Sequence, residues 1–76
     1  MNEEQRVLIQ ILEFVQANTT LGIHIHFYPT NMIVQGGYDE AGKELLYHKI
    51  YFEDGKSLAN EYHRLYEGLK QLKETN

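Results

Sequence analysis

The stretch LGIHIHFY, residues 21–28, decides the fold of this chain. Apolar and polar side chains alternate along it, and an extended backbone sends alternate side chains to opposite faces. The stretch is thereby sorted into one apolar and one polar face: Ile23, Ile25 and Phe27 against His24, His26 and Tyr28. This alternation predicts a β-strand over residues 21–28 with one face buried.

Two further strands are predicted to follow over residues 32–37 and 43–53. Pro29-Thr30-Asn31 indicates the first turn, because proline presets φ and cannot donate a ladder hydrogen bond. The segment from Asp39 to Lys43 indicates a second turn in which Gly42 takes the left-handed conformation. The three strands should form an antiparallel meander in the order 1-2-3.

The two turns predict one consistent register. Pairing Phe27 with Met32 puts Val34 opposite Ile25 and Gln35 opposite His24. The second turn pairs Asp39 with Lys43, which carries Val34 opposite His48 and Met32 opposite Ile50. Since both registers keep the apolar residues on one face, they support each other. The predicted core is made of Phe27, Ile25, Val34, Ile50 and Leu65.

Helices are predicted at both ends, over residues 2–17 and 57–73. Asn2 and Gln5 match a capping box at the start of the first helix. Its apolar residues cover an arc of about 160°, wider than the roughly 100° that a surface helix needs, so a second helix or a partner should cover part of it. An Asp54-Gly55 turn and Ser57 as N-cap introduce the second helix, whose apolar stripe is Leu58, Tyr62, Leu65, Leu69 and Leu72.

These elements predict one small α+β domain over residues 1–76, with the order α-β-β-β-α. Both helices should pack on the apolar face of the three-stranded sheet. The opposite face, which holds His24, His26 and the tyrosines at 28, 47 and 51, should then be left open to solvent.

Composition excludes several classes of protein. The net charge is −4, and the seven lysines and arginines are scattered, whereas a nucleic-acid binder normally gathers them into a basic patch. Apolar runs such as Val7–Ile9 are far shorter than the roughly 20 residues of a membrane span. With no cysteine and no signal peptide, we expect a cytoplasmic chain without membrane contact.

The usual catalytic motifs are not found in the sequence. Ser57 is the only serine and suits a helix cap, cysteine is absent, and no glycine-rich phosphate loop occurs. The pair His24 and His26 has metal-ligand character, since residues two apart on a strand project side by side. A third ligand is not evident, so we expect no metal or other cofactor, and an interaction protein rather than an enzyme.

The open face is the candidate functional surface, because tyrosine is enriched at binding surfaces. Its candidate partner-binding residues are His24, His26, Tyr28, Gln35, Tyr47, Lys49 and Tyr51. The favoured hypothesis is a small interaction module of the adaptor or inhibitor type, bound to a protein partner or to itself through strand 21–28, as a homodimer. The alternatives are a binder of a flat, nucleotide-like molecule, and a metal-binding or catalytic protein built on His-x-His.

Overall fold

The computed structural model describes residues 1–53 and 57–75 and confirms the α+β fold. Its elements, in chain order, are helix α1 (Glu3–Ala17), a 3-10 turn η1 (Thr19–Leu21), strands β1 (Ile23–Phe27), β2 (Asn31–Tyr38) and β3 (Glu44–Tyr51), and helix α2 (Ala59–Thr75). The strands form one antiparallel sheet in the order β1-β2-β3.

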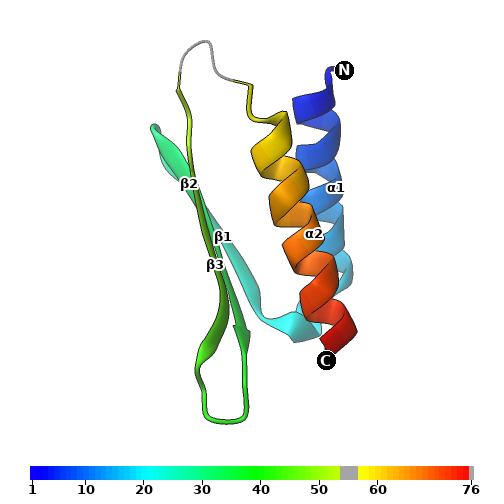
Figure 1. The fold of residues 1–76 in the computed structure, drawn as a ribbon, viewed down its shortest axis with the longest axis vertical. Coiled ribbons are helices and arrows are strands. Elements are labelled where there is room, and N and C mark those ends of the chain that lie inside the picture. Colours follow the sequence, from blue (N-terminus) through cyan, green and yellow to red (C-terminus); the bar gives the residue numbers. More distant parts are fainter. Residues whose placement is uncertain (54–56, 76) are drawn as a thin grey trace.

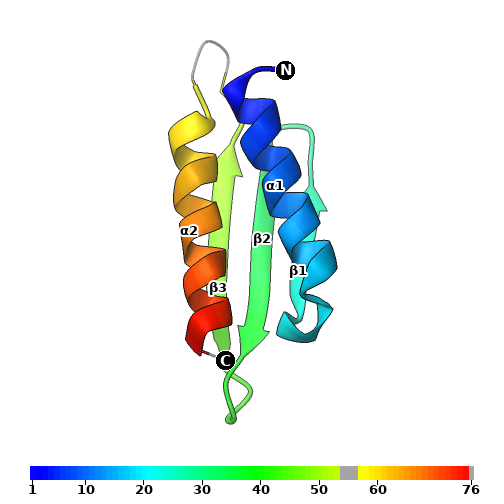
Figure 2. The ribbon, with the colours of Figure 1, turned by 90° about the vertical axis from the view of Figure 1, so that its right-hand side faces the viewer.

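One layer of helix covers one layer of sheet. Figure 1 shows the sheet nearly edge-on, with α1 and α2 together on one side of it. In Figure 2, α2 lies over β3, and α1 crosses obliquely from β2 towards β1. The hairpin between β2 and β3 extends beyond the helices and gives an elongated molecule of 41 × 21 × 17 Å. The other side of the sheet carries no helix.

The strand register is the one that the two turns predict. Phe27 pairs with Met32, and Ile25 with Val34. On the other side of β2, Val34 pairs with His48 and Met32 with Ile50. The hairpin turn also matches, because Gly42 has a φ of +82° and the Asp39 carboxylate accepts hydrogen bonds from the N–H groups of Ala41 and Lys43. The carboxylate thus holds the turn that sets the register.

Strand β1 begins at Ile23, so the prediction that it starts at Leu21 is wrong. Residues 19–21 form a 3-10 turn that ends at Gly22 in the left-handed conformation, with φ +67° and ψ +38°. The Gly22 carbonyl then lies against Gly36 of β2, where a side-chain carbon would overlap its oxygen. Glycine at position 36 is therefore what lets the chain enter the sheet at this point.

The predicted cap of α1 is confirmed. The Asn2 side chain accepts a hydrogen bond of 2.8 Å from the Gln5 N–H, and the Gln5 side chain accepts one of 3.1 Å from the Asn2 N–H. Glu3 and Glu4 stand in the first turn, where their negative charge suits the helix dipole. This start is readable from sequence because all of its partners lie within one turn.

The start of α2 differs from the prediction. The Ser57 hydroxyl accepts only a long bond of 3.4 Å from the Ala59 N–H, whereas the Glu4 carboxylate of α1 accepts one of 2.8 Å from the Leu58 N–H. A residue 54 positions away thus supplies the stronger contact. The helix runs from Ala59 to Thr75 instead of 57 to 73, and β3 ends at Tyr51 instead of residue 53. The Asp54-Gly55 turn lies outside the described residues.

The core lies between the helix layer and the sheet. Its fully buried side chains come from both helices and from β2 and β3: Val7, Ile11, Met32, Val34, Ile50, Leu65 and Leu69. The two helices also meet through the rings of Phe14 and Tyr66, edge to face at 5.9 Å. This contact covers one flank of the wide apolar arc of α1.

Phe27 is not part of the core, which corrects the prediction that it is buried. Its side chain is 55% exposed, and Ile25 is only partly buried. Phe27 is the last residue of the edge strand, so a neighbouring strand flanks it on one side alone. Alternation placed the ring on the correct face, but the oblique course of α1 leaves that end of the face uncovered (Figure 2).

His48 is the one histidine on the helix-facing side of the sheet. Burial lowers its pKa below the ordinary 6.5; the Glu61 carboxylate opposes this shift, and the Arg64 charge adds to it. The unfolded chain therefore binds a proton at this site before the folded chain does as the pH falls. The contribution of His48 to stability is complete above about pH 6.5 and is lost as the pH falls through the lower pKa of the folded state.

We expect Ile50→Ala to lower the free energy of unfolding by about 2–5 kcal/mol, because it opens a cavity in a fully buried site. Leu45→Ala is the matched control, since Leu45 lies on the same strand but is 48% exposed, and it should cost about 1 kcal/mol or less. Denaturant unfolding of both variants provides the measurement. Equal losses would contradict the assignment of the two faces.

We expect His48→Gln to reduce the loss of thermal stability between about pH 7.5 and about pH 5.5, because glutamine has no proton to gain. Glu3 does not obscure this window: the hydrogen bond from His63 lowers its pKa below the ordinary 4.5, so its contribution is lost only in stronger acid. Melting curves at the two pH values measure the effect. A variant that loses as much as the wild type would contradict it.

Candidate functional site

The side of the sheet away from the helices, here called the open face, holds all seven predicted partner-binding residues. They lie in three rows across the strands. The first row is His24, Gln35 and Tyr47, and the second is His26, Ile33 and Lys49. The third is Tyr28, Asn31 and Tyr51, in which Tyr28 and Asn31 exchange backbone hydrogen bonds of 2.8 and 3.4 Å. The meander thus gathers residues from three separate segments.

The tyrosines of the open face are accessible to a partner. Tyr47 is 58% exposed, Tyr51 51% and Tyr28 48%. A tyrosine ring offers a large apolar area and a hydroxyl that can bind through hydrogen bonds, while only two side-chain torsions must be fixed on binding. A set of such exposed rings on one face of a sheet is chemically suited to binding a protein surface.

Lys49 is the one charged side chain on the open face among the residues of β1, β2 and β3. Its ammonium lies 4.9 Å from the centre of the Tyr51 ring, at cation–π distance. A hydrogen bond with the Tyr51 side chain raises the pKa of Lys49, followed by the charges of Tyr51, Tyr47 and Tyr28. The chain is acidic as a whole, yet this face presents a positive group among aromatic rings.

The rings of His24 and His26 lie side by side, with centroids 6.5 Å apart and planes 27° from parallel. Both side chains are exposed. A metal site built on them needs further ligands, and within residues 1–53 and 57–75 no group of three or more histidine, aspartate, glutamate or cysteine side chains lies together. The pair alone offers two imidazoles to a partner or an ion.

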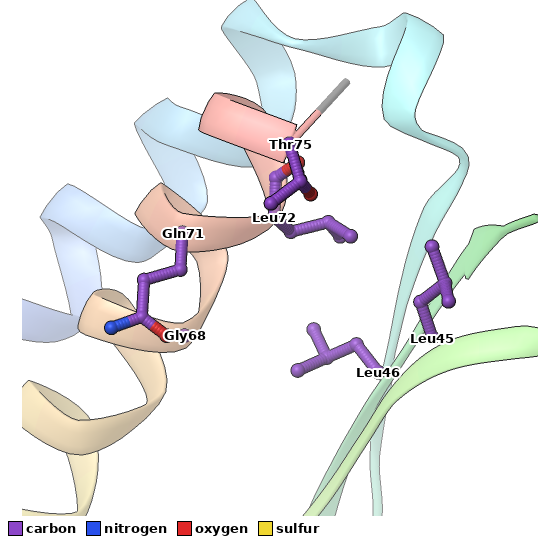
Figure 3. A pocket seen from close by; sticks show the side chains of 6 residues that line it. All are labelled: Leu45, Leu46, Gly68, Gln71, Leu72 and Thr75. Atoms are coloured by element: carbon purple, nitrogen blue, oxygen red, sulfur yellow. The ribbon is translucent and has the colours of Figure 1, made fainter.

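A shallow groove of about 350 Å³ lies between β3 and the last turns of α2 (Figure 3). Leu45, Leu46 and Leu72 supply its apolar lining, and Gly68, Gln71 and Thr75 complete it. The Thr75 hydroxyl is used within the helix, where it donates to the Leu72 carbonyl at 3.0 Å. None of the described residues that line the groove is charged, and none is an open-face tyrosine, so these residues offer no positive group that would bind phosphate.

Among the described residues, the structure places Ser57 and the histidines at separate points of the fold. Ser57 lies at the start of α2, where its hydroxyl accepts a hydrogen bond from the Ala59 N–H. His63 is bound to the Glu3 carboxylate at 2.8 Å and thus ties α2 to α1. His48 faces α2, on the opposite side of the sheet from His24 and His26. The histidines are thus divided between two faces of the sheet and the helix layer.

Sequence reasoning left two groups of residues out of the candidate site. Ile33 and Leu45 supply the apolar part of the open face, and their position follows from the same alternation that identified the tyrosines. Leu8, Ile9 and Leu12 form a flank of α1 on which Leu8 is partly buried and the other two are exposed. The width of the apolar arc was the available signal, but periodicity does not tell which part of an arc the rest of the chain covers.

In the part of the chain that the structure describes, neither helix is long and apolar enough to cross a membrane. Comparison with known proteins finds no family model, no curated protein and no solved structure that this chain matches.

Proposed function

We propose that this chain is a small non-enzymatic protein-interaction module of the adaptor or inhibitor type, which acts in the cytoplasm. Its binding surfaces are the open face and the free edge of β1. The observation that carries the proposal is the set of exposed tyrosines, Tyr28, Tyr47 and Tyr51, held in register on one side of a sheet whose other side carries both helices.

The charge of the open face indicates what kind of partner fits it. Lys49 sits beside Tyr51, and the strand residues of this face include no carboxylate. A partner surface with an apolar centre and an acidic side chain opposite Lys49 is therefore complementary. Tyr47 and Tyr51 flank Lys49 on the same strand and are the expected anchors.

We expect Tyr47→Ala or Tyr51→Ala to change the free energy of unfolding by about 1 kcal/mol or less, because both rings are exposed. Each should weaken partner binding by about 2 kcal/mol, the usual loss at an aromatic hot spot. The partner is captured on immobilised chain, identified by mass spectrometry and purified. Its affinity for each variant is then measured by calorimetry.

Tyr38→Ala is the matched control. Tyr38 is 50% exposed but lies at the hairpin end of β2, paired with Glu44, away from the three rows. Its substitution should leave partner binding unchanged. Equal binding by wild type and both open-face variants would contradict the proposal. Retention of a small molecule in native mass spectra, without a stoichiometric protein, would favour the ligand-binding alternative instead.

A further inference from the structure

The free edge of β1 carries a defined set of unpaired backbone groups. Tyr28 and Asn31 exchange two backbone hydrogen bonds with each other. Along an antiparallel ladder, residue pairs that exchange two hydrogen bonds alternate with residue pairs that exchange none. In the register of β1 with β2, His24 and His26 therefore direct their N–H and C=O groups towards β2. Those of Ile23, Ile25 and Phe27 point outward.

This edge lacks the usual protection. Natural edge strands are defended by lysine, proline or a bulge, because an open row of donors and acceptors pairs with other chains. The sequence of β1 is IHIHF, and the only proline follows the strand at position 29. Among the described residues, β1 is paired with β2 alone.

Helix α1 carries a flank of uncharged side chains. Met1, Gln5, Leu8, Ile9 and Leu12 line a shallow groove of about 290 Å³, in which Ile9 is 37% and Leu12 39% exposed. The C-terminal half of α1 lies over β1 (Figure 2). Depletion of charge together with apolar exposure is typical of the centre of an interface.

We propose that a second copy of this chain occupies this edge, with Ile25 on a two-fold axis. The two β1 strands then run antiparallel, Ile25 exchanges both hydrogen bonds with Ile25 of the second copy, and Ile23 does so with Phe27. This register uses every outward-pointing residue of β1. It joins two three-stranded sheets into one of six strands.

The strand sequence favours a second copy over another peptide. IHIHF has the same order of apolar residues and histidines in both directions. Symmetric pairing therefore sets apolar side chains against apolar ones on the helix side, and histidine against histidine on the open face. The ring of Phe27, which is exposed in the single chain, comes to lie beside Ile23 of the second copy.

The symmetry also accounts for the α1 flank. A two-fold axis perpendicular to the sheet keeps the helices of both copies on the same side, with the two α1 helices antiparallel next to each other. The side chains of the groove carry no charge, so bringing the two flanks together sets no charged side chains of the groove against each other. In this dimer the edge and the flank of each copy both face the second copy.

This inference rests on the proposed use of the β1 edge as a binding surface and names its occupant. Sedimentation equilibrium of the full chain should show a dimer. A monomer at all concentrations up to about 1 mM, where binding of about 4 kcal/mol would still be seen, overturns the inference. That result leaves the proposed partner binding by Tyr47 and Tyr51 untouched, because neither residue lies on the β1 edge.

Charge substitutions at the two histidines test the register itself. The double variant His24→Lys, His26→Lys sets ammonium groups against each other across the axis and should weaken the dimer by about tenfold or more. The double variant His24→Glu, His26→Lys sets each carboxylate opposite an ammonium and should dimerise at least as well as the wild type. Its dissociation to monomers would overturn the register.

One control substitution on the sheet and one matched pair on α1 separate the contact surface from general effects. Gln35→Lys lies beside His24 but on the middle strand, so it should leave the dimer intact. Leu12→Lys, in the groove, should weaken the dimer by about tenfold or more, whereas Gln10→Lys on the exposed side of α1 should not. Equal effects of Leu12→Lys and Gln10→Lys would overturn the participation of α1.

Discussion

Val34 has Ile25 on one neighbouring strand and His48 on the other, and this row fixes which face of each strand meets the helices. Because side chains alternate strictly, a slip by one residue would bring Tyr47 and Lys49 under α2 and expose Ile50. The Asp39 carboxylate and Gly42 hold the register at the hairpin, and Gly36 holds it where the chain enters β1. The core, the open face and the edge all follow from this one constraint.

The two helices are joined to each other by polar contacts at their first turns. Glu4 caps the start of α2 through the Leu58 N–H, and Glu3 binds His63 on the next turn of that helix. Phe14 and Tyr66 close the opposite half of the helix pair. These contacts fix the helices as one layer above β2 and β3, and they draw α1 away from the end of β1 where Phe27 is exposed.

The surfaces left after the core is complete are chemically distinct. The open face combines tyrosines with Lys49 on a rigid, helix-backed sheet, which suits a partner protein. The β1 edge and the α1 flank combine unpaired backbone groups with uncharged apolar side chains, which suits a copy of the same chain. Since the two surfaces share only the histidines, the proposed dimer keeps Tyr47 and Tyr51 of both copies accessible, and with them both of the proposed partner-binding sites.

The sequence by itself determined the features that depend on neighbours in the chain. Alternation gave the faces of the strands, the turns gave the pairing of Met32 with Ile50, and Asn2 with Gln5 gave the cap of α1. The open-face residues came together for the same reason.

Only the tertiary structure decided how far each apolar residue is buried and which groups cap a helix from a distance. Phe27 is exposed because α1 crosses obliquely, and the Leu58 N–H is bound by Glu4 of the other helix. Such contacts join segments far apart in the chain, so no local pattern in the sequence records them.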